Sequence, residues 1–91
     1  MEIGIVGAGI AGLAASIRAA VAGHKVTVFE VNSYPGGKLT AFEKQGYRFD
    51  AGPSLFTMPQ YVDELFLLAG ENPADHFKYL RLDPVCNYFW E

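Results

Sequence analysis

The spacing of apolar positions changes along the chain, and each spacing predicts a different element. Residues 3–6 form a short β-branched run, typical of a strand buried in a parallel sheet. Over residues 10–22 apolar side chains recur at intervals of three and four, which predicts a helix ended by Gly23. Residues 25–30 predict a second strand. Strand, helix and strand within about 30 residues form a βαβ unit with a right-handed crossover.

The pattern changes after the second strand. Proline and glycine within residues 31–37 indicate a loop. Residues 39–50 then alternate on both sides of a glycine-containing turn, which predicts an antiparallel hairpin. Residues 57–69 predict a second helix, in which Thr57 and Gln60 form a capping box.

The last part of the chain again has the composition of strands. Residues 77–82 and 87–90 are rich in aromatic and aliphatic side chains, and Asp83-Pro84 separates them. The sequence therefore predicts an α/β fold: a partial Rossmann-like domain, then a hairpin, a helix and the start of an antiparallel sheet.

Composition and charge narrow the class of protein. The 91 residues are 51% hydrophobic and 19% charged, as in globular domains. A net charge of −3 without a basic patch gives no indication of nucleic-acid binding. The single Cys86 fits a reducing compartment, so we expect a cytoplasmic protein. Neither His24 nor His76 has neighbours at metal-ligand spacing, and we expect no metal site.

The glycines between the first strand and the first helix fit a known binding pattern, which gains weight from the strand before it and the helix after it. Residues 7–12, GAGIAG, fit the Gly-x-Gly-x-x-Gly pattern of dinucleotide-binding domains. Gly7 makes the turn out of the strand, Gly9 lets a pyrophosphate approach the backbone, and Gly12 allows close helix packing. The N–H groups and the dipole at the start of the helix favour negative charge.

An acid at the end of the second strand completes this pattern. Glu30 follows the glycines by about 20 residues, where a carboxylate accepts hydrogen bonds from ribose hydroxyls and argues against a 2′-phosphate. The alternative is that the glycines only form a tight strand-to-helix turn. The first group of candidate cofactor-binding residues is Gly7, Ala8, Gly9, Ile10, Ala11, Gly12 and Glu30.

Four stretches together resemble a known family. GAGIAGLAA, HKVTVFE, YPGGK and GYRFDAGPSLFTMP are similar to the N-terminal part of bacterial FAD-dependent phytoene desaturases, which are carotenoid desaturases of the flavin amine oxidase-like superfamily. The resemblance implies FAD as the cofactor. It places two further groups near the diphosphate and the flavin: Gly36, Gly37 and Lys38, and the backbone of Asp50, Ala51, Gly52 and Pro53.

From the residues alone, purely structural roles for residues 36–38 and 50–53 stay open. Residues 36–38 could be a turn with a solvated lysine, and residues 50–53 could simply end the hairpin. Many family members have arginine at position 38, and lysine keeps the charge but loses the bidentate fork. A pyridine-nucleotide dehydrogenase is a further alternative, although the double glycine and the hairpin argue against it.

The resemblance also implies an activity and a domain division. Residues 1–76 would belong to the FAD-binding domain, and residues 77–91 would begin the substrate-domain strands of a longer chain. The implied reaction is desaturation of an apolar polyene such as phytoene by hydride transfer to flavin, at a membrane surface that the enzyme touches peripherally. A carotenoid isomerase or ketolase and a non-catalytic nucleotide-binding module remain alternatives. No residue receives a catalytic role, the oligomeric state stays open, and we expect the 91-residue chain alone to be inactive.

Overall fold

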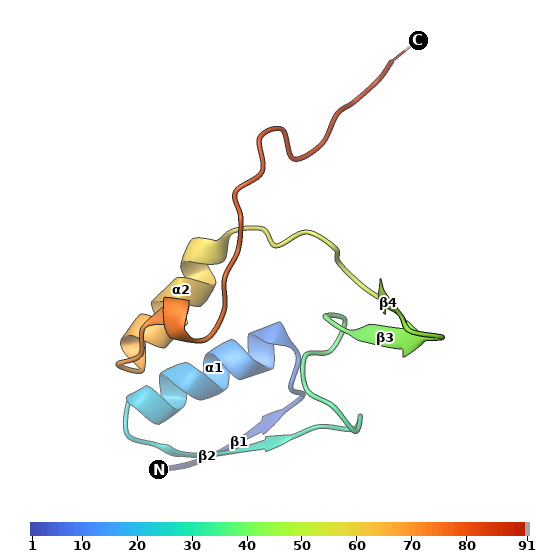
Figure 1. Ribbon diagram of the computed structural model, residues 1–91. Coiled ribbons are helices and arrows are strands. Elements are labelled where there is room, and N and C mark those ends of the chain that lie inside the picture. The colour runs from blue at the N-terminus through green and yellow to red at the C-terminus, as the bar shows by residue number, and fades with distance from the viewer. Residues whose placement is uncertain (91) are drawn as a thin grey trace.

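The computed structural model describes residues 1–90 and has the predicted α/β class (Figure 1). Two small sheets, two α-helices and one short 3₁₀ turn follow one another along the chain. In order they are β1 (Glu2–Val6), α1 (Ile10–Val21), β2 (Lys25–Phe29), β3 (Ala41–Lys44), β4 (Tyr47–Asp50), α2 (Pro59–Leu68) and η1 (Pro73–Asp75).

The predicted βαβ unit forms the first half of the chain. Strands β1 and β2 pair in parallel, with Glu2 opposite Lys25 and Val6 opposite Phe29, and α1 crosses over one face of this sheet (Figure 1). The other face is open, and Val6 is 91% exposed. The expectation of a strand buried on both faces is therefore wrong for residues 1–90, because only α1 covers this sheet.

Both α-helices end as their sequences predict. Gly23 adopts a left-handed φ of 93°, its N–H donates to the Ala20 carbonyl at 3.0 Å, and the His24 N–H donates to Ala19 at 3.1 Å. This pair of bonds is a Schellman motif, which satisfies carbonyls that the helix leaves free. Gly70, with φ of 80°, ends α2 with the same pair of bonds.

The start of α2 differs from the prediction. Its N-cap is Met58, which has a left-handed φ of 52° and makes no side-chain capping bond. Pro59 occupies the first turn, as expected, where its missing N–H costs nothing. The predicted capping box of Thr57 and Gln60 is wrong, because the helix begins two residues after Thr57, whose side chain no longer lies at the cap position.

The predicted hairpin is present and tighter than expected. Its first strand begins at Ala41, opposite Asp50, rather than at residue 39. The turn consists of Gln45 and Gly46 alone, with φ values of 53° and 81°. Two positive φ values are those of a type I′ turn, whose twist matches that of the flanking strands.

The strands predicted for residues 77–82 and 87–90 do not form. After η1 the chain runs out in an extended path (the red end in Figure 1). A strand needs a partner for its backbone hydrogen bonds, and residues 1–90 offer this segment none. Apolar composition alone therefore gave the wrong prediction here. Glu91, the last residue of the expected 77–91 portion, lies outside the described residues.

Side-chain contacts hold the start of this extended segment against α2. The ring of Phe77 lies 5.9 Å from that of Phe56 and 5.4 Å from that of Phe66. The Tyr79 hydroxyl donates to the Asp63 carboxylate at 3.0 Å. The contact with Phe56 joins the segments that precede and follow α2, and the contacts with Phe66 and Asp63 join the following segment to α2 itself.

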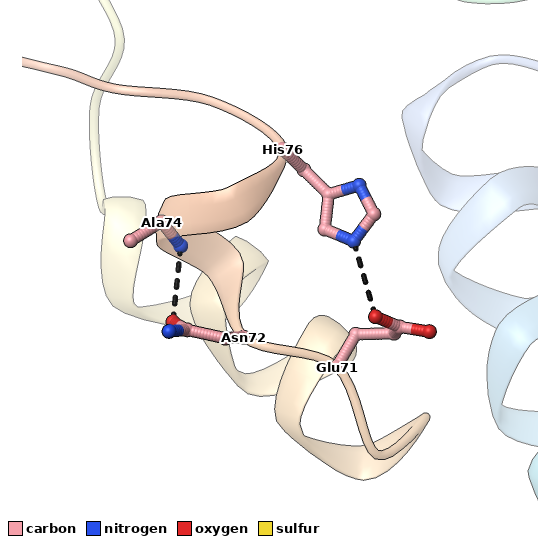
Figure 2. Close-up of polar contacts among 4 residues, drawn as sticks. All are labelled: Glu71, Asn72, Ala74 and His76. Carbon is pink, nitrogen blue, oxygen red and sulfur yellow. Dashed lines mark hydrogen bonds and ion pairs between the residues drawn. The ribbon is translucent and has the colours of Figure 1, made fainter.

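Polar contacts shape the connection between α2 and this segment. Figure 2 shows the Ala74 N–H donating to the Asn72 side chain at 3.2 Å, which caps η1. It also shows His76 Nε2 at 3.4 Å from the Glu71 carboxylate. The imidazole of His76 stacks on Phe66 with ring centres 4.9 Å apart. His76 is thus a packing and pairing residue of this connection.

Helix α2 packs against α1 on the side away from the sheet (Figure 1). Arg18 of α1 pairs with Glu64 of α2 at 2.8 Å, and Leu65 is one of the two buried apolar residues among residues 1–90. Within residues 1–90 no helix combines the length and the hydropathy needed to cross a bilayer, and the longer one, α1, has 12 residues.

Candidate dinucleotide-binding site

The glycine loop, residues 7–12, connects the carboxyl end of β1 to α1. Gly7 has φ of 99°, a left-handed conformation that glycine adopts without strain. Its N–H donates to the Phe29 carbonyl at 2.7 Å, so the turn begins while the chain is still held to the sheet. The loop therefore opens at the edge of the sheet where ligands of Rossmann-like domains bind.

Gly12 packs the helix onto this turn. A Cβ at position 12 would overlap the Gly7 carbonyl oxygen and would lie 3.0 Å from its carbonyl carbon. Real Cβ atoms essentially never come so close to backbone atoms. The close packing predicted for this glycine is therefore a property of the structure.

Gly9 leaves an open space in front of the helix. It is the N-cap of α1, with φ of −71° and ψ of 179°, and a Cβ there would meet no atom within 4 Å. No side chain caps the helix, and its first turn carries no acidic residue. Backbone N–H groups and the positive end of the helix dipole thus face a space that suits a diphosphate.

Glu30 lies beside this loop, directly after β2. One carboxylate oxygen accepts the Ala8 N–H at 3.1 Å, and the other accepts the Asn32 N–H at 3.4 Å. The side chain is half-buried. A carboxylate has about four acceptor positions, so Glu30 keeps capacity for a ribose hydroxyl after both bonds are made.

The double glycine lies directly against the glycine loop. The Gly36 N–H donates to the Ala8 carbonyl at 2.7 Å, and Gly36 forms an isolated parallel bridge with Gly9. A Cβ on Gly37 would be 3.2 Å from the Gly9 Cα. Two motifs that are separate in the sequence thus form one glycine-lined surface, with the exposed Lys38 next to it.

The stretch after β4 adds a third side to this surface. The Ala51 N–H donates to the Thr40 carbonyl at 2.9 Å, and Gly52 passes directly over the Lys38 carbonyl. The Asp50 carboxylate instead pairs with Arg48 of the same strand at 3.0 Å. The backbone of residues 50–52, rather than the Asp50 side chain, therefore connects this stretch to the rest of the site.

The structure brings most of the candidate residues together. Residues 7–12, residues 36–38 and Gly52 form a connected series of backbone contacts, and Pro53 lies exposed at its end. The Glu30 carboxylate joins this series through the Ala8 N–H. The sequence reasoning did not identify Thr40, although its pairing with Ala51 continues the register of β3 and β4. No group of three or more His, Cys, Asp and Glu side chains within residues 1–90 is arranged to hold a metal ion.

Comparisons with known proteins agree with this geometry. The family model for the NAD(P)-binding Rossmann-like domain matches residues 5–71. The chain is 54% identical over 87 residues to the 1-hydroxycarotenoid 3,4-desaturase of Flavobacterium sp. (strain P99-3), covering 96% of this chain and 18% of that protein. It is 36% identical over all 91 residues to the 4,4'-diapophytoene desaturases (4,4'-diaponeurosporene-forming) of Staphylococcus aureus strains bovine RF122 / ET3-1 and Newman, again covering 18% of each.

Two facts follow from these comparisons. The resemblance to carotenoid desaturases is confirmed, since relatives with that name match nearly the whole chain. The chain spans about a fifth of the length of these relatives, 18% in each case.

Proposed function

Because the chain belongs to the family of NAD(P)-binding Rossmann-like domains, we propose that it is the FAD-binding region of an oxidoreductase that desaturates a carotenoid. The similarity to proteins named 1-hydroxycarotenoid 3,4-desaturase and 4,4'-diapophytoene desaturase supports the substrate class. The site geometry supports the cofactor, and one observation carries that part of the proposal.

That observation is the contact between the double glycine and the glycine loop. A Rossmann-like half that binds NAD normally continues after the second strand with a helix and a third parallel strand. Here β2 is followed by a loop whose Gly36 bridges to Gly9, and then by the β3–β4 hairpin. The polypeptide thus borders the space in front of α1 on a second side. This second border supports binding of a larger dinucleotide such as FAD.

The residues of the chain would bind and orient this cofactor. The first-turn N–H groups of α1 and the Cβ-free Gly9 would receive the diphosphate, and Glu30 would accept hydrogen bonds from the adenosine ribose. Lys38 would offset negative charge on the phosphates or on the reduced ring system. When bound, the flavin supplies the acceptor for a hydride from an allylic carbon, while a proton leaves the adjacent carbon.

We further propose that the complete gene product works in the cytoplasm at a membrane surface. A polyene is wholly apolar and dissolves in the hydrocarbon of a bilayer, so the enzyme must reach it there. Flotation of the complete gene product with phospholipid vesicles containing a carotenoid would test this. A protein that stays in the soluble fraction and still desaturates vesicle-bound carotenoid would contradict it.

The cofactor proposal is tested by Gly9→Val in the complete gene product. Position 9 has an ordinary extended conformation and free space for a Cβ, so valine strains no backbone there. Because valine is a poorer helix N-cap than glycine, we expect a loss of about 1 kcal/mol in the free energy of unfolding, which leaves the protein folded. The valine side chain would occupy the space for the diphosphate, and we expect FAD affinity to fall by roughly tenfold or more, about 1.4 kcal/mol per factor of ten. Equilibrium titration of the apoprotein measures this.

A matched control and an alternative complete the test. Gly4→Ala adds a Cβ in ordinary contact with the Phe29 ring, at 3.5 Å and away from the loop, and should leave FAD affinity unchanged. Undiminished FAD binding by Gly9→Val would refute the proposal. Chromatographic identification of the ligand released from purified protein as a pyridine nucleotide would favour the dehydrogenase alternative, which the name of the family model supports.

A further inference from the structure

Lys38 directly follows the double glycine, yet its side chain is not tied down. It is exposed and forms no ion pair with any other group in residues 1–90. The contacts that hold residue 38 in place are therefore those of its backbone. On the N-terminal side, Gly36 and Gly37 lie against Ala8 and Gly9, and the Leu39 N–H closes a turn onto the Gly36 carbonyl at 3.1 Å.

Gly52 contacts Lys38 from the opposite side. A Cβ at position 52 would overlap the Lys38 carbonyl oxygen, would lie 3.0 Å from its carbonyl carbon and would lie 3.9 Å from the Leu39 nitrogen. Gly52 does not have the left-handed φ that characterises Gly36 and Gly37. The requirement for glycine at position 52 is therefore the close approach to Lys38 and not an unusual backbone conformation.

The hairpin keeps Gly52 in this place. The bond from the Ala51 N–H to Thr40 extends the β3–β4 register by one pair beyond Ala41 and Asp50. With residues 40 and 51 joined, Gly52 lies over the carbonyl of Lys38. The backbone of Lys38 is thus enclosed between the double glycine and Gly52.

We propose that Gly52 is a positioning residue for Lys38: it fixes the lysine backbone so that the ammonium group is presented to the dinucleotide from the side of the glycine loop. This inference rests on the proposed function. It gives Gly52 a role through Lys38, whereas the family resemblance implies a direct backbone approach of this stretch to the cofactor.

A double-mutant cycle on FAD affinity in the complete gene product tests this role. The variants are Gly52→Ala, Lys38→Met and the double variant, each titrated with FAD as the apoprotein. We expect each single substitution to weaken FAD binding by roughly tenfold. The double variant should bind FAD at most about threefold more weakly than either single variant. A displaced lysine and an absent lysine lose the same interaction, so the two losses should not add. Additive losses, about a hundredfold in the double variant, would overturn the proposal.

Gly46→Ala provides a matched control for loss of stability. Gly46 lies in the turn of the same hairpin with φ of 81°, so alanine strains the backbone there, but a Cβ would meet no atom within 4 Å. If Gly52→Ala acted only by loosening the hairpin, Gly46→Ala would show the same non-additivity with Lys38→Met, and that result would overturn the proposal.

A measurement without cofactor separates this inference from the proposed function. The carbonyl ¹³C chemical shift of Lys38 in labelled apoprotein should change in Gly52→Ala and stay in place in Gly46→Ala. An unchanged Lys38 shift in a folded Gly52→Ala variant would overturn the positioning role alone. Absence of FAD binding by the unsubstituted protein would overturn the proposed function, and with it the proposal that the Lys38 ammonium group faces FAD.

Discussion

Two regions of this chain are both rich in apolar residues and differ strongly in order. Residues 1–52 contain β1, α1, β2 and the hairpin, and their loops are held to one another by backbone hydrogen bonds. Residues 77–90 are richer in aromatic side chains, with five in 14 residues against five in the first 52, yet form no helix or strand. The difference lies in what each backbone can bond to, since apolar side chains are abundant in both.

The comparison shows that glycines and turns specify the first region more than apolar residues do. Gly12 permits α1 to approach Gly7, and the bridge from Gly36 to Gly9 attaches the following loop. In the second region, Phe77 and Tyr79 make ring contacts and Tyr79 makes a hydrogen bond to Asp63, and these are side-chain contacts. Backbone contacts propagate order along a chain, whereas isolated ring contacts fix only the residues that make them.

The largest effect is expected from Gly12→Ala, which would loosen the first region until it resembles the second. The added Cβ would overlap the Gly7 carbonyl, and overpacking of this kind costs about 1–3 kcal/mol. The free energy of unfolding in urea, followed by circular dichroism, measures the loss. Gly4→Ala is the matched control and should change the free energy by about 0.5 kcal/mol or less. Equal stability of the two variants would contradict the packing argument.

An intermediate effect is expected from Glu30→Ala, which removes one link between β2 and the glycine loop. The Ala8 and Asn32 N–H groups would lose their acceptor, and we expect a loss of about 1–2 kcal/mol in the free energy of unfolding. Glu30→Gln keeps an oxygen acceptor and should lose roughly half as much. Unfolding in urea measures both. Equal losses would mean that the charge, rather than the hydrogen bond to Ala8, connects the two segments.

The smallest effect is expected from Tyr79→Phe, which tests the second region. The hydrogen bond to Asp63, followed by burial and by the charge of Asp63, raises the pKa of Tyr79 above its usual value of 10.0. A raised pKa means that the contact is intact below pH 10 and is lost as the pH rises through the pKa of the folded protein. Ultraviolet titration of the five tyrosines should therefore show a late phase that disappears in Tyr79→Phe.

A control for this titration is Tyr88→Phe. Tyr88 is 76% exposed and lies beyond the ring contacts of Phe77 and Tyr79, so the late phase should remain. A late phase that persists in Tyr79→Phe would show that the hydrogen bond to Asp63 does not hold this segment in solution.

The sequence predicted those parts of the fold that depend on neighbouring residues. Gly23, Gly46 and Gly70 end helices or turn strands through their own φ angles, and all three act as expected. The start of α2 was predicted wrongly, because the left-handed Met58 satisfies no local rule of capping chemistry. The strands after residue 76 were also predicted wrongly, because strand formation depends on a partner that composition does not reveal.

The candidate site divides in the same way. The glycine pattern and Glu30 were identifiable because each has a known place relative to a strand and a helix. The approach of Gly52 to Lys38 was not, since it depends on how the hairpin turns back after residue 40. Residue spacing in the sequence predicts local turns, whereas contacts between residues far apart in the sequence become known only from the structure.

The bridge between Gly9 and Gly36 has a consequence for protein engineering. The segment between β2 and Gly36 must have the length that returns the chain to Ala8. Insertions there would therefore detach the double glycine from the glycine loop. A transplant of GAGIAG into a foreign scaffold would therefore carry over only one part of the glycine-lined candidate surface. The natural module for grafting is the continuous block of residues 1–52, moved with its loop lengths intact.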